Sequence, residues 1–213
     1  MFGPHPSISL FTNTHTLTHP TLRRHALSAL FLLITSLVLS GCGEPKPTRV
    51  LLVGGAGLSQ LGTLGATISA MSPDAEVIET GGWDGFRSNL RRIIKDRPSE
   101  GLVLIGHSFG CQTIAQAAAD VPQVDLVVMI DPAWDDITLP RTVYSCLWYQ
   151  RSDLGAERRA VIRNGGRPMI VNGDHNSICY SPQLIAEVSR IVRDLSDRKA
   201  MHQRMREMRA PRR

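Results

Sequence analysis

The chain has 213 residues, of which 42% are hydrophobic and 20% are charged, a composition typical of one globular domain with a buried core. Its net charge of +5 is concentrated at the ends, because residues 1–41 carry only Arg23 and Arg24 and residues 198–213 carry seven basic side chains against Glu207. The stretch between them has a net charge of about −3, so the basic pI gives no argument for nucleic-acid binding by the folded body, and no nucleic-acid partner is expected.

The first segment predicts export from the cytoplasm. An uncharged run from Ala26 to Leu39 follows two arginines; it is too short to span a bilayer comfortably and has the length of a signal-peptide core. It ends in Leu-Ser-Gly-Cys, with Cys42 last, which resembles the lipobox of bacterial lipoproteins. The resemblance implies cleavage before Cys42, lipid on its sulfur and amino group, and anchoring in the cell envelope. A plain signal peptide or an apolar N-terminal helix is the alternative.

We therefore divide the chain into a signal peptide (1–41), a stiff polar tether (42–48), a folded domain (49–197) and a basic C-terminal tail (198–213). In the tail, Met201, Met205 and Met208 recur at a helical spacing among arginines. One interpretation is a basic amphipathic helix on an anionic membrane surface, and the other is a solvated, frayed extension of the last helix.

Within the domain, short aliphatic runs alternate with segments of helical periodicity. The first half predicts strands over Arg49–Val53, Ala75–Thr80 and Gly101–Ile105, and helices over Leu58–Met71, Asp84–Lys95 and Thr113–Ala119. The second half predicts strands over Val124–Ile130, Val143–Tyr149 and Arg167–Asn172, a short helix over Gly155–Asn164 and a closing helix from Pro182. Strand and helix thus alternate about six times, which predicts an α/β fold with a doubly wound, mostly parallel sheet covered on both faces.

The pentapeptide from Gly106 to Gly110 reads Gly-x-Ser-x-Gly and lies between a predicted strand and a predicted helix. This is the setting of a nucleophile elbow, in which a sharp turn exposes the serine hydroxyl at its tip. Ser108 is therefore the candidate nucleophile, and His107 beside it is expected to point away from that hydroxyl. The alternative is a glycine-rich turn with an idle serine.

Three further polar residues come just after predicted strands, where functional groups of a parallel sheet gather. A serine hydroxyl needs a base, and His175 is the histidine that directly follows the last predicted strand, whereas His202 lies in the tail. The imidazole in turn needs a carboxylate, for which Asp131 and Asp153 compete. Asp131 is favoured because it stands at the tip of its strand, whereas Asp153 lies farther along and could cap a helix. The neighbouring Asp174 is expected to point away from His175.

The chain order Ser, Asp, His and the run from Ile130 to Ala133 resemble α/β-hydrolase fold enzymes of the lipase and esterase type. The resemblance covers most of residues 49–195. It implies a triad of Ser108, Asp131 and His175, with the oxyanion held by the backbone N–H groups of Phe109 and Ala56. Glycine stands where such enzymes often have a histidine in the loop after the first strand.

These residues lead to the expectation of a lipid-anchored serine esterase acting on a small-molecule or lipid ester, without cofactor or metal. A thioesterase with the same triad and an inactive binding lipoprotein on this fold are the alternatives. Only about ten residues separate Pro132 from Val143, so no cap domain and an open site are expected. Cys146 and Cys179 are the expected disulfide pair, and Cys111 is expected to be a small buried residue.

Overall fold

The computed structural model describes residues 48–55, 60–80, 86–96, 99, 101–133, 136–155 and 160–209. The predicted signal peptide, Cys42 and the tether before Thr48 lie outside the described residues. The chain divides into two compact units, Met1–Glu44 and Pro45–Arg213, and every described element belongs to the second. Among the described helices, none is long and apolar enough to cross a membrane.

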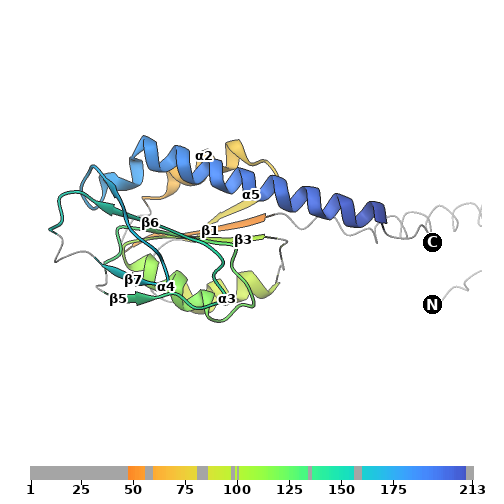
Figure 1. Ribbon diagram of the computed structural model, residues 1–213, viewed down its shortest axis with the longest axis horizontal. Helices are drawn as coiled ribbons and strands as arrows, with labels where there is room; N and C mark the ends of the chain where they lie inside the picture. The colour runs from red at the N-terminus through yellow and green to blue at the C-terminus, as the bar shows by residue number, and fades with distance from the viewer. Residues whose placement is uncertain are drawn as a thin grey trace, which may run out of the picture. The chain divides into compact units, whose positions relative to one another are not determined.

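A six-stranded parallel sheet forms the centre of the second unit, as the sequence predicted (Figure 1). Its strands are β1 (Thr48–Val53), β2 (Ala75–Glu79), β3 (Gly101–His107), β4 (Leu126–Ile130), β6 (Cys146–Arg151) and β8 (Met169–Val171). Their order in the sheet is β2-β1-β3-β4-β6-β8, and every neighbouring pair is parallel.

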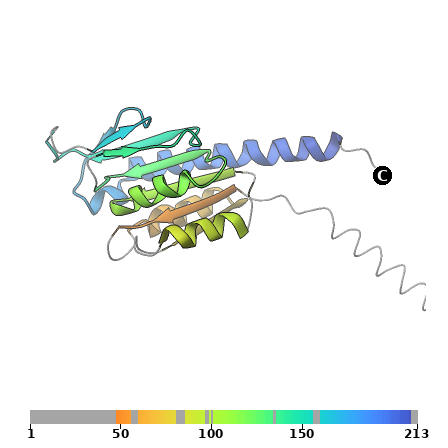
Figure 2. The same cartoon turned by 90° about the horizontal axis from the view of Figure 1, so that it is seen from below.

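Helices cover both faces of the sheet. Helices α2 (Gly62–Met71) and α5 (Pro182–Arg209) pack together on one face, and α3 (Phe86–Asp96) and α4 (Phe109–Ala118) on the other. Figure 2, seen from below, has α3 and α4 in front of the sheet and α5 behind it. Helix α5 is continuous across the predicted domain–tail boundary at residue 198, and Lys199 pairs with Asp125 before β4 at 2.7 Å.

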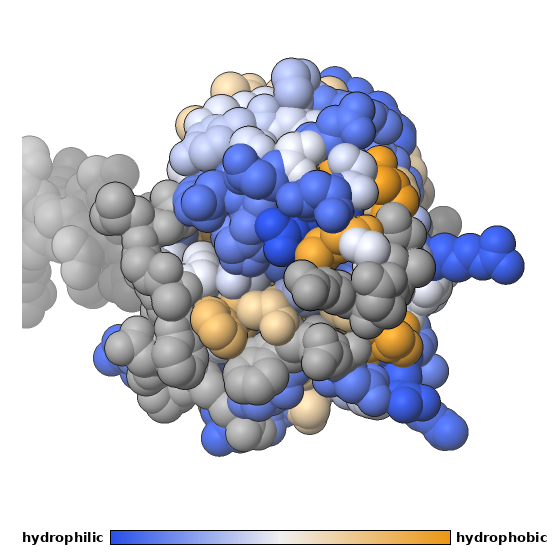
Figure 3. Space-filling model, turned by 90° about the vertical axis from the view of Figure 1, so that its left-hand side faces the viewer, coloured by the Kyte–Doolittle hydropathy of each residue, from blue (hydrophilic) through white to orange (hydrophobic). Residues whose placement is uncertain are grey.

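The strand order reverses between β1 and β3, the place where functional groups of such sheets gather. Gly54 and Gly55 follow β1, and Ser108 follows β3, so the candidate nucleophile lies at this point. The end of the unit opposite the α5 extension faces the viewer in Figure 3, where hydrophilic residues lie beside a few hydrophobic ones.

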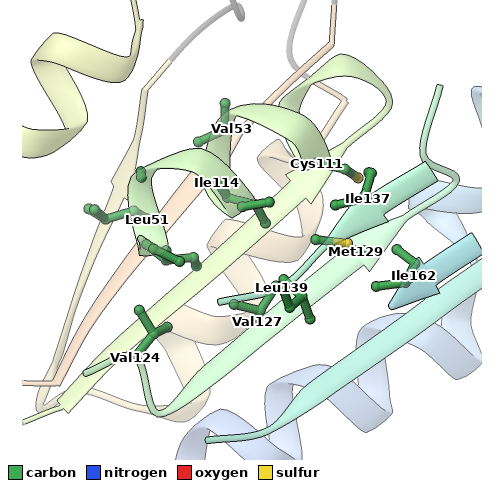
Figure 4. Close-up of a cluster of buried hydrophobic side chains, with 14 of the residues drawn as sticks. Leu51, Val53, Cys111, Ile114, Val124, Val127, Met129, Ile137, Leu139 and Ile162 are labelled. Atoms are coloured by element: carbon green, nitrogen blue, oxygen red, sulfur yellow. The ribbon is translucent and has the colours of Figure 1, made fainter. Parts of the chain in front are cut away.

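Alternation along the strands builds two separate cores. In β1, Leu51 and Val53 belong to the cluster under α4 (Figure 4), whereas Val50 and Leu52 belong to the cluster under α2 and α5. All four side chains are fully buried. Because successive side chains of a strand point to opposite faces, a run of consecutive aliphatic residues is what a strand covered on both faces requires.

The predicted helix over Gly155–Asn164 is wrong in its described part. Val161–Arg163 forms strand β7, which pairs in parallel with β5 (Asp136–Thr138), with Ile162 opposite Ile137. In both strands the central isoleucine is buried and its neighbours are exposed, an alternation of period two that helical spacing does not produce. Asp136 lies in β5 and pairs with Arg163 at 2.9 Å.

The other elements lie within a few residues of their predicted positions. Helix α4 begins at Phe109, earlier than predicted, so it starts directly after Ser108. Strand β6 begins only at Cys146, because Val143 forms just an isolated bridge with Val124. Ser177–Tyr180 is a short 3-10 helix that the sequence did not predict.

Candidate active site

The turn between β3 and α4 holds Ser108 in a conformation that few side chains adopt, with φ of 56° and ψ of −125°. Its backbone N–H donates a hydrogen bond to the Ile130 carbonyl at 3.0 Å. A Cβ added at Gly110 would lie 2.1 Å from the Val53 carbonyl oxygen, and one at Gly106 would lie 2.8 Å from the backbone of Gly110. Both glycines of the pentapeptide are therefore required for the chain to pack through this turn.

Gly55, in the loop after β1, lies against the side chain of Ser108. A Cβ added at Gly55 would come within 2.8 Å of Ser108 Cβ and 3.1 Å of its Oγ. The next residue, Ala56, was the expected oxyanion donor and lies outside the described residues. The other expected donor, Phe109, is the first residue of α4, where backbone N–H groups point out of the helix end.

The imidazole of His175 joins Ser108 to Asp131. Its Nε2 lies 2.9 Å from Ser108 Oγ, and its Nδ1 lies 2.5 Å from Asp131 Oδ2. Because a carboxylate only accepts, Nδ1–H donates to Asp131, and Nε2 is left to accept from the Ser108 hydroxyl. The structure thus brings the three expected side chains together from the ends of three different strands.

Asp131, and not Asp153, reaches the imidazole. The side chain of Asp131 is 3% exposed, whereas that of Asp153 is 56% exposed and contacts Arg151 at 3.5 Å. Both nitrogens of the His175 ring are already engaged by Asp131 and Ser108. Asp131 also has a positive φ of 43°, a conformation that aspartate tolerates better than most residues.

Local hydrogen bonds fix the loop that carries His175. The Asp174 carboxylate accepts from the backbone N–H groups of Ser177 and Asn176, both at 2.8 Å, and these bonds lower the pKa of Asp174. Gln60, before α2, donates its side-chain N–H to the Asn176 side chain at 2.7 Å. Asp174 is therefore occupied by its own loop, and the expectation that it turns away from His175 is confirmed.

Two residues beside the site were not assigned a role from the sequence. His107 donates a hydrogen bond from Nε2 to the His175 carbonyl oxygen at 2.8 Å. Arg151, the last residue of β6, lies with its Nε 3.2 Å from Asp131 Oδ2, the same oxygen that binds His175. Arg151 therefore places a cationic group beside the buried carboxylate that His175 also binds. The sequence signal for both is their position at a strand end on the same edge as Ser108.

The cysteines take no part in these contacts. Cys111 is buried as expected, and its Sγ lies 3.2 Å from the Gly106 carbonyl oxygen. Cys146 and Cys179 are free thiols, so the expected disulfide is not formed. Burial raises the pKa of each of these two thiols to about 12. In the part of the chain that the structure describes, no group of three or more histidine, cysteine, aspartate or glutamate side chains could hold a metal ion.

We expect Gly110→Ala to destabilise the fold, because its new Cβ would overlap the Val53 carbonyl oxygen. Overpacking of this kind costs about 1–3 kcal/mol or more of the free energy of unfolding, measured by urea denaturation. Gly62→Ala is the control, since the nearest atom to its Cβ is 3.8 Å away and alanine favours the helix. Equal stability of the Gly110→Ala variant and the wild type would contradict this account of the turn.

No protein-family model matches the chain, and no curated protein matches it. Among solved structures, the esterase domain from a Rhodothermus marinus protein is 15% identical with a TM-score of 0.47, over 72% of this chain and 90% of that one. RedJ, with a PEG molecule bound in its active site, is 10% identical with a TM-score of 0.48, over 70% and 93%. Likeness at this level does not define a reaction, so the chemistry must be inferred from Ser108, His175 and Asp131.

Proposed function

We propose that this protein is a serine hydrolase that cleaves carboxylic esters through an acyl-enzyme and is anchored to the cell envelope. The observation that carries the proposal is the hydrogen-bonded chain from Ser108 Oγ through the His175 ring to the buried carboxylate of Asp131. An isolated serine hydroxyl is a weak nucleophile at neutral pH, and a base within hydrogen-bond reach activates it. In the proposed reaction, His175 is this base and Asp131 is the carboxylate that orients it.

In the first half-reaction, Ser108 Oγ attacks the ester carbonyl carbon while its proton moves to His175 Nε2. The imidazolium that forms is stabilised by Asp131, which keeps Nδ1–H in place throughout. Collapse of the tetrahedral intermediate breaks the bond to the alcohol oxygen, and Nε2–H protonates that oxygen as it leaves. The product of this step is an acyl group esterified to Ser108.

In the second half-reaction, water takes the place of the alcohol and loses a proton to His175 Nε2 as it attacks the acyl carbon. Ser108 then leaves with that proton, which releases the carboxylic acid. In both halves we assign the oxyanion to the backbone N–H groups of Phe109 and Ala56. Supporting this, Phe109 starts α4 directly after the serine, and Gly55 brings the chain that precedes Ala56 against Ser108.

We propose that the substrate carries a short or exposed acyl group. Ser108 itself is 4% exposed, whereas the side chain of His175 is 37% exposed, so the imidazole is the more accessible of the two. Between β4 and β6, the described residues form the short strand β5 and no helix, so they provide no helical cap over this edge.

The anchoring part of the proposal is supported by the Leu-Ser-Gly-Cys motif that ends at Cys42. Lipid on this cysteine would place the hydrolase at the bacterial envelope, in the outer membrane or facing the periplasm where the cell has two membranes. The partners proposed are therefore a membrane, through the lipid, and an ester of small-molecule or lipid type.

A fluorophosphonate probe is expected to label the wild type and not Ser108→Ala, because only an activated serine reacts with it. Mass spectrometry of the labelled peptide should find the adduct on Ser108. A second arm compares p-nitrophenyl esters with acyl thioesters, which separates an esterase from a thioesterase. A folded wild type that takes up no label would overturn the proposal in favour of a binding protein.

Asp131→Asn is expected to lower kcat for a p-nitrophenyl ester by on the order of 10⁴, because an amide no longer holds the required tautomer of His175. Asp153→Asn is the matched control: it removes an equal charge from the other neighbour of Arg151 and should leave kcat within about twofold. The reverse pattern, with Asp153 the sensitive position, would show that the acid has been assigned wrongly.

Cys42→Ser is expected to abolish lipid attachment. Cells that express the full chain and are fed an alkyne-bearing palmitate should incorporate it into the wild type and not into this variant, as read by click labelling on a gel. Cys146→Ser retains the Leu-Ser-Gly-Cys motif and should label like the wild type. Incorporation that persists in Cys42→Ser would mean that the motif is not a lipidation site.

A further inference from the structure

His107 is a buried imidazole to which the reaction above gives no part. Only 3% of the residue is exposed, and burial of a polar ring requires a compensating contact. The side chain lies where strand alternation directs it: Val103 and Ile105 belong to the cluster under α2 and α5, and His107 is the next residue in that series. Ser108 is the next residue and lies in the turn, so the side chains of these two adjacent residues point in different directions.

Two contacts join His107 to His175. The first is the hydrogen bond from His107 Nε2 to the main-chain carbonyl of His175, at 2.8 Å. The second is between the two rings, whose centroids are 4.7 Å apart and whose planes are inclined by 35°. Because a carbonyl only accepts, the proton of neutral His107 must be on Nε2. One side chain thus touches both the backbone and the ring of His175.

The charge state of His107 suits this place. Burial lowers the pKa of His107, which favours the neutral ring beside His175. When His175 takes the proton from Ser108, it becomes a cation, and a second cation at this distance would oppose that step. The Asp131 carboxylate acts on His107 in the opposite sense, but desolvation is the larger effect.

We propose that His107 is a positioning residue that holds the base of this hydrolase in register with Ser108. The inference rests on the proposed function, because it assigns the effect of His107 to His175 acting as that base. The His175 side chain is 37% exposed, and Asp131 fixes only one nitrogen of its ring, so the ring could still turn about that contact. His107 binds the backbone carbonyl of His175 and packs against the His175 ring.

Three variants separate the two contacts. His107→Gln keeps an N–H donor without a ring, His107→Phe keeps a ring without a donor, and His107→Ala keeps neither. Misplacement of a catalytic group by about 1 Å costs on the order of 100-fold, so His107→Ala should lower kcat for a p-nitrophenyl ester by about that factor, with KM changed by less than about threefold. The other two variants should fall between it and the wild type. His202→Ala, exposed on α5, is the control and should leave kcat unchanged.

A double variant tests whether His107 acts through His175. In an Asp131→Asn background the ring is already misaligned, so adding His107→Ala should lower kcat by less than about tenfold. Urea unfolding establishes which variants are folded. If His107→Ala does not fold, the kcat values of His107→Gln and His107→Phe test the inference instead. Folded variants with kcat within about twofold of wild type, or an undiminished loss in the double variant, would overturn the inference. Fluorophosphonate labelling of Ser108 in the same samples tests the proposed function separately.

Discussion

The structure depends on one tight turn, in which Ser108 joins the buried strand β3 to helix α4 at a positive φ. Holding such a backbone costs of order 1–3 kcal/mol, which the surroundings must offset. They do so by close packing: Gly110 lies on the Val53 carbonyl, and Gly55 lies on the serine side chain. The same contacts that hold the strained turn also place the loop after β1 beside the hydroxyl. The support of the fold and the arrangement of the site are therefore one set of contacts.

Near this turn, His175 is contacted at both ring nitrogens, at its backbone carbonyl and at its ring. Asp131 binds one ring nitrogen, Ser108 occupies the other, and His107 contacts the carbonyl and the ring face. Arg151 contacts the oxygen of Asp131 that His175 also uses, so the buried carboxylate has two positive or donating partners. In the proposed reaction, an imidazole with this many fixed neighbours would be preorganised for proton transfer.

The sequence predicted the features that a local residue pattern encodes, and it missed those that depend on contacts between residues far apart in the chain. Gly-x-Ser-x-Gly and the aliphatic runs mark a strand, a turn and a helix, and these formed where expected. The position of Asp131 at the strand tip favoured it over Asp153, but the direction of each carboxylate, which no spacing reveals, was needed to show that only Asp131 reaches the imidazole. His107 meets a carbonyl 68 positions away, and Arg151 was not singled out because a strand-end arginine reads as surface charge. The helix predicted over Gly155–Asn164 failed because Ile162 is placed by pairing with β5.

The pairing of β5 with β7 affects how the protein unfolds locally. The two crossovers after β4 and β6 each contribute one strand, and Arg163 joins them by bonding Asp136 through Nε and Nη2. Ile137 and Ile162 complete the core beneath, so neither crossover is covered without the other. The proposed acid, Asp131, and the proposed base, His175, lie on the segments before β5 and after β7, whereas the proposed nucleophile, Ser108, belongs to the half built from helical crossovers. Local opening of the β5–β7 pair would release the chain on either side of it and disable the proposed site, while the first four strands and the serine turn remain folded.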